Sequence, residues 1–166
     1  YVRARVAIEP ASRRFVFLAL AFLAASNLAL LSNHLMLMWI GLEATTLAAA
    51  LMIVRGDAAS RLASWRYLLF SSVGLALVLL GLSCLTRSME LSGHDATLFL
   101  DEMPAALDRP ADAWRQLGVA LAILGIGTKL GLAPMYSWLP EAYDESPAPV
   151  TALLGAVQFN IALVLL

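Results

Sequence analysis

The sequence predicts an all-α polytopic membrane protein, built as a bundle of about five transmembrane helices. Apolar residues make up 61% of the 166 residues, against about 45–50% in a soluble domain. Charged residues make up 14%, where about 25% is usual. The charges leave three long uncharged stretches, which are residues 15–42, 67–86 and 146–166. Because a helix needs about 20 apolar residues to cross a bilayer, this distribution excludes a soluble globule.

Five membrane spans can be placed along the chain. We expect them at about residues 15–31, 35–54, 67–85, 117–139 and 150–166. A tight turn at 32–34 joins the first two spans, a polar loop at 55–66 precedes the third, and an outside loop at 86–116 precedes the fourth. No soluble domain fits between the spans, so residues 1–166 are expected to form a single transmembrane domain. The chain starts without methionine and stops inside an apolar run, which favours a fragment of a larger polytopic subunit.

The arginines predict how the bundle is oriented. With the N-terminus in the cytoplasm, seven arginines lie on the inner side: Arg3, Arg5, Arg13, Arg14, Arg55, Arg61 and Arg66. Three lie on the outer side: Arg87, Arg109 and Arg115. Cytoplasmic loops carry an excess of Lys and Arg. We therefore expect a multi-pass protein of a prokaryotic-type cytoplasmic (inner) membrane with its N-terminus in the cytoplasm.

Charge and composition exclude several classes of function. The 11 basic and 12 acidic residues nearly cancel, so the chain has no basic footprint for nucleic acid. The single cysteine, Cys84, lies in an apolar run and is expected to pack there. One Cys and two His provide neither an iron–sulfur nor a zinc spacing. We expect no metal site and no redox centre carried by this chain itself, and no nucleotide fingerprint or nucleophile constellation indicates a soluble-type enzyme.

A broken helix is predicted in the fourth span. Pro134 lies inside the apolar run and removes a backbone hydrogen bond there, close to the flexible Gly127 and Gly131. Interrupted backbone at membrane depth persists only where protein or a water-filled cavity covers it, which favours a conduction path. Gly127 and Gly131 also have the small-xxx-small spacing that lets two helices approach closely.

Two charges lie deep inside predicted spans. Glu43 is the ninth residue of the second span, and Lys129 lies near the middle of the fourth. A charge at the bilayer centre costs about 2.5–3.5 kcal/mol on insertion scales. The least costly arrangement is mutual, with the carboxylate and the ammonium facing each other inside the bundle.

This pair can be interpreted in two ways. In the first, it is a static ion pair that fixes how the helices pack. In the second, it is a proton relay, because moving Glu43 toward or away from Lys129 would make the lysine take up or release a proton. The glycines and proline around Lys129 favour the relay, since the freed backbone groups need water and water carries protons.

Other polar residues receive lesser roles. Thr45, Thr46, Ser71, Ser72 and Thr128 are expected to bond back to their own helices. Three residues are retained as possible relay or path-lining groups: His34 at a span end, Asn160 in the fifth span, and Thr128 beside Lys129. Trp65, Tyr67 and Trp114 flank the third and fourth spans and are expected to be interface anchors.

Three segments resemble a known family. Residues 38–47 (MWIGLEATTL) resemble the helix with the key glutamate in the antiporter-like subunits of respiratory complex I. Residues 127–134 (GTKLGLAP) and 137–140 (SWLP) resemble the lysine-bearing broken helix of those subunits, and 141–154 resemble the loop and helix start that follow. The EATTL motif at residues 43–47 and the absence of a histidine around Gly155 favour the hydrogenase-4 component F branch.

The resemblance implies the fourth to eighth helices of a roughly fourteen-helix, proton-translocating subunit, with Glu43 and Lys129 as its functional pair. It implies partner subunits, both membrane and peripheral, that carry the cofactors of the complex, which are quinone and NADH, or NiFe and iron–sulfur centres. The complex would be an NADH:quinone oxidoreductase or a membrane-bound [NiFe] hydrogenase of formate hydrogenlyase type. Glu141, Tyr143 and Gly155 depart from the usual pattern, and the last removes a protonatable residue that several relatives have on the next helix.

Two other functions are compatible with these residues. One is a stand-alone or inorganic-carbon-linked cation/proton transporter with the same core. The other is a structural membrane module in which Glu43 and Lys129 only hold helices together.

Overall fold

The computed structural model describes residues 12–106, 112–133 and 135–166, and within these ranges it contains helices and no strand. The main helices are α1 (Arg13–Leu31), α2 (Leu35–Ile53), α3 (Ala58–Leu91) and α5 (Ala113–Leu130). Shorter ones are α4 (Met103–Ala106), α6 (Trp138–Glu145), α7 (Ala148–Leu153), the π-helix η1 (Leu154–Gln158) and α8 (Phe159–Val164). The predicted all-α fold class is confirmed.

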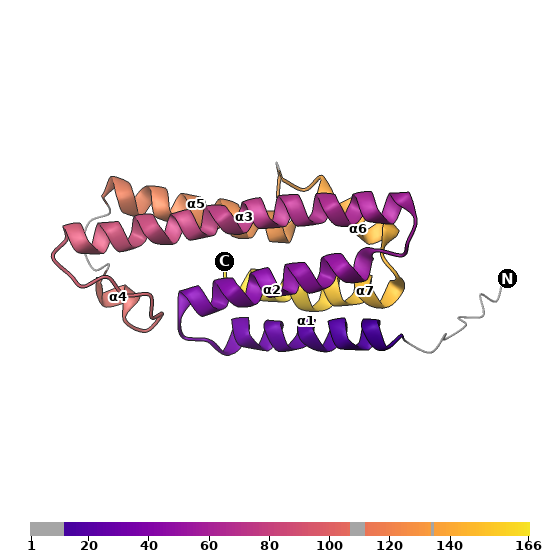
Figure 1. The fold of residues 1–166 in the computed structure, drawn as a ribbon. Coiled ribbons are helices and arrows are strands. Elements are labelled where there is room, and N and C mark those ends of the chain that lie inside the picture. Colours follow the sequence, from indigo (N-terminus) through magenta and orange to yellow (C-terminus); the bar gives the residue numbers. More distant parts are fainter. Residues whose placement is uncertain (1–11, 107–111, 134) are drawn as a thin grey trace.

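The long helices lie side by side along one axis (Figure 1). α1 packs along α2, α2 contacts α3, and α3 packs along α5. α7, η1 and α8 run on as one continuous helix that contacts α2, α5 and α1. The N-terminal end of α1 lies at the same end of the bundle as α6, while α4 lies at the opposite end (Figure 1).

Helix α3 is longer than the span predicted at 67–85. It begins at Ala58 because the Asp57 side chain caps it, accepting a hydrogen bond from the Ser60 backbone N–H at 2.7 Å. It continues to Leu91, so most of the predicted polar loop 55–66 and the start of the predicted loop 86–116 are helical. A helix of 34 residues is about 51 Å long, against about 30 Å of hydrocarbon, and it therefore extends beyond the bilayer.

The predicted break in the fourth span is present. Helix α5 ends at Leu130, where Gly131 adopts the left-handed conformation with φ 68°, and helix resumes only at Trp138. The Leu132 N–H bonds to the Gly127 carbonyl at 2.9 Å, which is a common way to close a helix C-terminus. Gly131 thus ends the helix, and Pro134, which was expected to break it, lies outside the described residues.

The close helix approach predicted at Gly127 and Gly131 occurs elsewhere. A Cβ added at Gly127 or Gly131 would meet only leucines of the chain that follows. A Cβ at Gly81 would lie 2.7 Å from the Gly118 carbonyl, and one at Gly74 would lie 2.9 Å from the Gly125 carbonyl. These two glycine pairs let α3 and α5 cross at backbone distance, whereas Gly127 and Gly131 make no close helix contact among the described residues.

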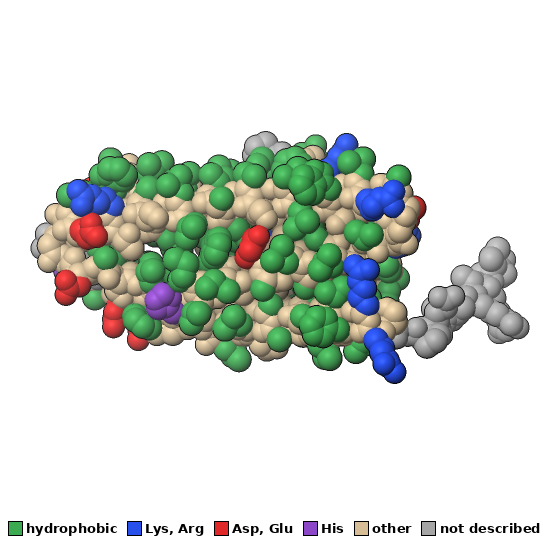
Figure 2. All heavy atoms as spheres, in the orientation of Figure 1, with side chains coloured by type: hydrophobic (Ala, Val, Ile, Leu, Met, Phe, Trp, Pro, Cys, Tyr) green, Lys and Arg blue, Asp and Glu red, His purple; other side chains and the backbone are tan. Residues whose placement is uncertain are grey.

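The surface of the bundle suits a bilayer. Within the described ranges, α1, α2 and α3 are long and apolar enough to cross a membrane. The other two predicted spans are not among these helices: α5 has 18 residues and ends at the glycine break, and the last helical segment, Ala148–Val164, is shorter. Apolar side chains are spread over the face in Figure 2, where an acidic side chain is also visible near the middle. Basic side chains gather mainly at the end nearest the N-terminus, and acidic ones mainly at the opposite end.

Candidate functional site

Lys129 is buried in the middle of the bundle, with 2% of its surface exposed. It belongs to the last turn of α5, whose free carbonyls give that end a partial negative charge that favours a cation. Its ammonium donates a hydrogen bond to the Thr46 hydroxyl of α2. That hydroxyl donates in turn to the Leu42 carbonyl at 3.0 Å, so its oxygen is left to accept from the lysine.

Glu43 lies one helical turn before Thr46 on α2. Its Oε1 accepts a hydrogen bond from the Ser72 hydroxyl of α3 at 2.9 Å. Its Oε2 is buried and has no hydrogen-bond partner among the described residues. The ion pairs found in the described part of the chain do not include Glu43 with Lys129. The two charges therefore form no direct ion pair among the described residues, because Thr46, on the same face of α2, accepts the hydrogen bond of the ammonium instead.

Tyr67 completes the surroundings of the lysine. The Lys129 ammonium lies 5.6 Å from the centre of the Tyr67 ring, within the range of a cation–π contact. The Tyr67 hydroxyl donates to Gln158 Oε1 at 2.7 Å, and the ring packs edge-on against Trp138 with centroids 5.2 Å apart. Tyr67 is fully buried, so its predicted role as an interface anchor was wrong.

Trp138 ties the two sides of the helix break together. Its indole N–H, at the start of α6, donates to the Thr128 carbonyl of α5 at 2.9 Å. The Thr128 hydroxyl donates to the Gly125 carbonyl at 2.7 Å, which is the bond within its own helix that was expected. The lysine therefore lies at the end of an interrupted helix, and a hydrogen bond from the buried Trp138 indole fixes α6 against α5.

Two predicted path-lining residues lie away from this group. His34 caps the N-terminus of α2, where its Nδ1 accepts from the Met36 N–H at 3.2 Å and its ring packs against Phe99. That position is about 13 Å along the helix axis from Glu43. Asn160 is exposed and donates to the Ala156 carbonyl of its own helix at 2.6 Å. The structure brings neither side chain to Lys129.

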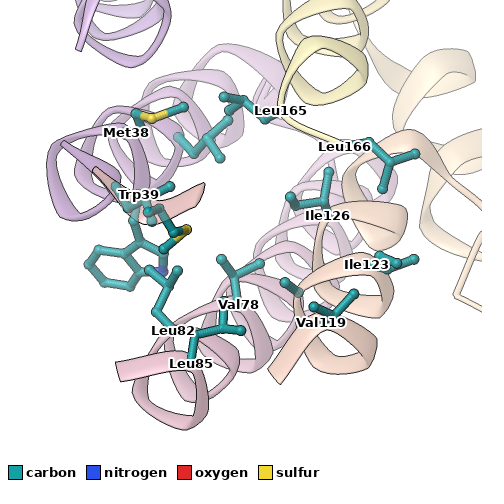
Figure 3. A pocket seen from close by; sticks show the side chains of 14 residues that line it. Met38, Trp39, Val78, Leu82, Leu85, Val119, Ile123, Ile126, Leu165 and Leu166 are labelled. Atoms are coloured by element: carbon teal, nitrogen blue, oxygen red, sulfur yellow. The ribbon is translucent and has the colours of Figure 1, made fainter. Parts of the chain in front are cut away.

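An apolar cavity lies apart from these charges. It has a volume of about 320 Å³, is partly open, and is lined by side chains of α2, α3, α4, α5 and the C-terminal residues (Figure 3). The indole N–H of Trp39, one of its lining residues, donates to the Leu75 carbonyl at 2.7 Å, so this cavity presents no free polar group from that side chain. Among the described residues no group of three or more His, Cys, Asp or Glu could hold a metal ion.

Sequence reasoning missed several of the residues that surround the pair. Thr46 and Ser72 were expected to bond only within their own helices, yet they contact Lys129 and Glu43. The three-residue spacing of Glu43 and Thr46 places them on one helix face and could have indicated Thr46. The sequence around Gln158 gave no indication of its role, because its hydrogen-bond partner Tyr67 is 91 positions away.

The sequence comparisons identify the family of this chain. The transmembrane family model of the NADH:quinone oxidoreductase/Mrp antiporter proteins matches residues 32–166, which include the lysine, the glutamate and the helix break. The chain belongs to this NADH:quinone oxidoreductase/Mrp antiporter family. It is thus a multi-pass membrane protein of the complex I-like, antiporter-like group.

Curated members of the family match nearly the whole chain. A hydrogenase-4 component F homolog of Methylacidiphilum infernorum is 36% identical over 94% of this chain. An NADH-quinone oxidoreductase subunit N of Desulforudis audaxviator is 31% identical over 98% of it. The chain spans about a third of the length of these relatives, 34% and 31% respectively.

Solved structures of membrane complexes contain chains with the same fold. Respiratory complex I from Thermus thermophilus contains a chain that is 25% identical, with a TM-score of 0.74 over 95% of this chain and 34% of that one. The archaeal membrane-bound sulfane sulfur reductase matches at 21% identity with a TM-score of 0.83, over 98% of this chain and 32% of that one. The helical arrangement around the broken α5 is therefore that of subunits in respiratory membrane complexes.

Proposed function

We propose that the chain is part of a proton-translocating membrane subunit of a redox-driven complex, with Lys129 as the proton-carrying group. The observation that carries this proposal is the position of the Lys129 ammonium. It is buried in the bundle at a helix break and bonded to a neutral hydroxyl. The Glu43 carboxylate lies one turn away, and its Oε2 has no hydrogen-bond partner in the described part of the chain. A structural ion pair would use that carboxylate directly.

The arrangement supports a switch between two partners of the lysine. When the ammonium moves from Thr46 to Glu43, the opposite charge stabilises its protonated form. When it returns to Thr46, its hydrogen-bond partner is a neutral hydroxyl beside the Tyr67 ring, and the proton is released more easily. Ser72 holds the carboxylate at Oε1, leaving Oε2 to accept the ammonium.

Substitution of the lysine tests this proposal. Lys129→Ala is introduced into the full-length subunit, and proton uptake is measured in inverted membrane vesicles started with NADH or, in separate samples, with hydrogen. We expect uptake per assembled complex to fall at least tenfold, because the group that binds the proton is gone. Asn27→Leu, which removes an exposed amide bonded to the Leu23 carbonyl of its own helix, is the matched control and retains uptake.

The same variants separate the relay from a structural module. If Glu43 and Lys129 only hold helices together, the double variant Glu43→Ala with Lys129→Ala restores the assembly and uptake that each single variant loses. We expect no such rescue of uptake. Normal uptake by an assembled Lys129→Ala complex contradicts the proposal outright.

The complex to which the subunit belongs is a further part of the proposal. The similarity to a hydrogenase-4 component F homolog favours a hydrogen-linked complex, and that to subunit N favours an NADH:quinone oxidoreductase. In either case the redox cofactors belong to partner subunits. Purifying the tagged full-length subunit in mild detergent, with mass spectrometry of its companions and a nickel assay, distinguishes the two: nickel with a hydrogenase large subunit supports the first, and a flavoprotein NADH module without nickel supports the second.

Cation/proton antiport is the second candidate, because the family description includes the Mrp antiporters. The lysine favours protons as the carried ion, since an ammonium repels Na⁺. A sodium-dependent pH change in vesicles that hold the purified subunit without redox partners supports antiport. Its absence, together with donor-driven uptake in the complex, supports the redox-driven proposal.

We propose that the N-terminus lies in the cytoplasm. Basic side chains gather at the end of the bundle nearest the N-terminus (Figure 2), and cytoplasmic loops carry an excess of Lys and Arg. Two exposed alanines lie at the opposite ends, Ala59 at the start of α3 and Ala96 beyond its end. In a Cys84→Ser background, a membrane-impermeant thiol reagent is expected to label Ala96→Cys from outside intact cells and Ala59→Cys only in inverted vesicles. The reverse pattern contradicts this orientation.

A further inference from the structure

Gln158 is a buried amide in an unusual stretch of helix. Only 2% of its surface is exposed, and its Oε1 accepts the hydrogen bond of the Tyr67 hydroxyl at 2.7 Å. It is the last residue of the π-helical turn η1, where the Phe159 N–H bonds back to the Leu154 carbonyl. Such π turns are rare and occur frequently at functional sites.

The amide fixes the direction of the tyrosine ring. Tyr67 is held by Gln158 at its hydroxyl and by the edge-on contact of Trp138 on its ring, so the ring has little freedom to turn. The same ring lies 5.6 Å from the Lys129 ammonium. The Thr46 hydroxyl, which accepts from the lysine, also lies close to the Tyr67 hydroxyl.

Among the described residues, charged groups face Tyr67 from two of the helices packed around it. From α2 it faces Glu43, and from α5 it faces Lys129. On α6, Glu141 and Glu145 are engaged in ion pairs with Arg66 and Arg55. η1 contributes the neutral amide, while Tyr143 of α6 lies instead against Gly155.

We propose that Gln158 is a positioning residue for Lys129, acting through Tyr67. It holds the tyrosine ring where its face stabilises the ammonium during the state in which the lysine is bonded to Thr46 and not to Glu43. The π turn sets the rotational position of Gln158 on its helix. This inference rests on the proposed function, since it assigns a role within the same proton-carrying site.

A double-mutant cycle in the full-length subunit tests it. Gln158→Leu replaces the amide with an apolar side chain of similar size, and Tyr67→Phe keeps the ring but removes the hydroxyl. Each is expected to lower proton uptake per assembled complex about three- to tenfold, the factor expected for one buried hydrogen bond. Because both variants remove the same bond, the double variant is expected to fall no further than either single one.

The pH dependence of uptake provides a readout that a purely structural role would not move. Without the fixed ring, the protonated lysine loses part of its stabilisation, so uptake is expected to decline at a lower pH than in the unaltered subunit. Asn27→Leu, which removes an exposed amide of α1 bonded to the Leu23 carbonyl of the same helix, is the control and leaves both the rate and the pH profile unchanged.

Each outcome bears on a different proposal. An unchanged rate and pH profile in an assembled Gln158→Leu complex overturns the positioning role, as does a strictly multiplicative loss in the double variant. Loss of uptake in Lys129→Ala with normal uptake in Gln158→Leu leaves the proposed function standing and removes only this inference. Normal uptake in Lys129→Ala removes the proposed function itself. Should Gln158→Leu fail to assemble, Tyr67→Phe alone decides, since a normal pH profile in it contradicts the inference.

Discussion

The Lys129 ammonium donates to the Thr46 hydroxyl, three positions beyond Glu43 on the same helix, and forms no direct ion pair with the Glu43 carboxylate. The two candidate partners of the lysine are thus neighbours on one face of α2. One is a neutral hydroxyl and the other a carboxylate. Because both partners lie on one face of α2, a lysine that leaves the hydroxyl turns toward the carboxylate, which is the exchange that the proposed relay requires.

Removal of the Thr46 hydroxyl is expected to slow proton transfer. Thr46→Val keeps the shape of the side chain but leaves the buried ammonium without its acceptor, and a hydrogen bond to a charged group contributes about 1.5–3 kcal/mol. We expect donor-driven proton uptake per assembled complex to fall about tenfold or more.

The neighbouring residue Thr45 provides a matched control. It is equally buried, and its hydroxyl donates to the Leu42 carbonyl at 2.6 Å, with no side-chain partner on another helix among the described residues. Thr45→Val is expected to retain most of the uptake, and Thr46→Ser to retain it as well. Equal losses in Thr45→Val and Thr46→Val contradict a specific role of the Thr46 hydroxyl.

Substitution of Ser72 is expected to lower proton uptake less than substitution of Thr46, because Ser72 bonds to the carboxylate and not to the lysine. Ser72→Ala removes the hydrogen bond to Glu43 Oε1 and lets the carboxylate turn. We expect uptake to fall about two- to fivefold with assembly unchanged. Ser83→Ala, which removes an exposed hydroxyl bonded to the Leu79 carbonyl, is the control; a Ser72→Ala complex that behaves like it indicates that Glu43 needs no such support.

The sequence predicted the elements of the fold better than the contacts between them. Uncharged stretches reveal membrane helices, and the glycines around Lys129 indicate an interrupted helix, because both signals are local. Helix α3 was underestimated at both ends, since hydropathy marks the apolar part of a helix and gives no sign that a capped helix continues into water.

The site was predicted in part for the same reason. Glu43 and Lys129 are conspicuous because charge inside an apolar run is costly wherever its partner lies. Which groups meet that charge depends on how the helices are rotated and spaced. Thr46, Tyr67 and Gln158 come from three different elements, and nothing in their local sequence states that they converge.

The start of α3 is expected to lose stability in acid. The Ser60 backbone N–H donates to the Asp57 carboxylate and, with smaller help from Arg55, holds the pKa of Asp57 below its ordinary value. A carboxyl group with a lowered pKa stabilises the folded state above about pH 4, the pKa of an unfolded Asp. That contribution is lost as the pH falls through the lower, folded pKa.

Thermal unfolding of the purified complex at different pH values tests this cap. Asp57→Ala is expected to unfold at a lower temperature than the unaltered protein at pH 7, and the difference is expected to shrink toward pH 3. Asp57→Asn is the control, because asparagine caps helices about as well as aspartate but does not titrate. A difference for Asp57→Ala that is the same at pH 7 and pH 3 contradicts a role of the charge.

The glycine crossing of α3 and α5 is expected to be sensitive to a single methyl group. A Cβ at Gly74 would overlap the Thr128 side chain and lie 2.9 Å from the Gly125 carbonyl, so Gly74→Ala forces the two helices apart. Overpacking of this kind costs about 1–3 kcal/mol, and separating the helices would also displace Lys129 on α5. Gly127→Ala is the matched control, since its Cβ would meet only Leu132 Cδ1, at 3.4 Å. We expect Gly74→Ala to lower both the thermal stability of the complex and its proton uptake, and Gly127→Ala to leave the stability nearly unchanged. If the two variants are equally stable, the backbone crossing of α3 and α5 is not what holds the broken helix in place.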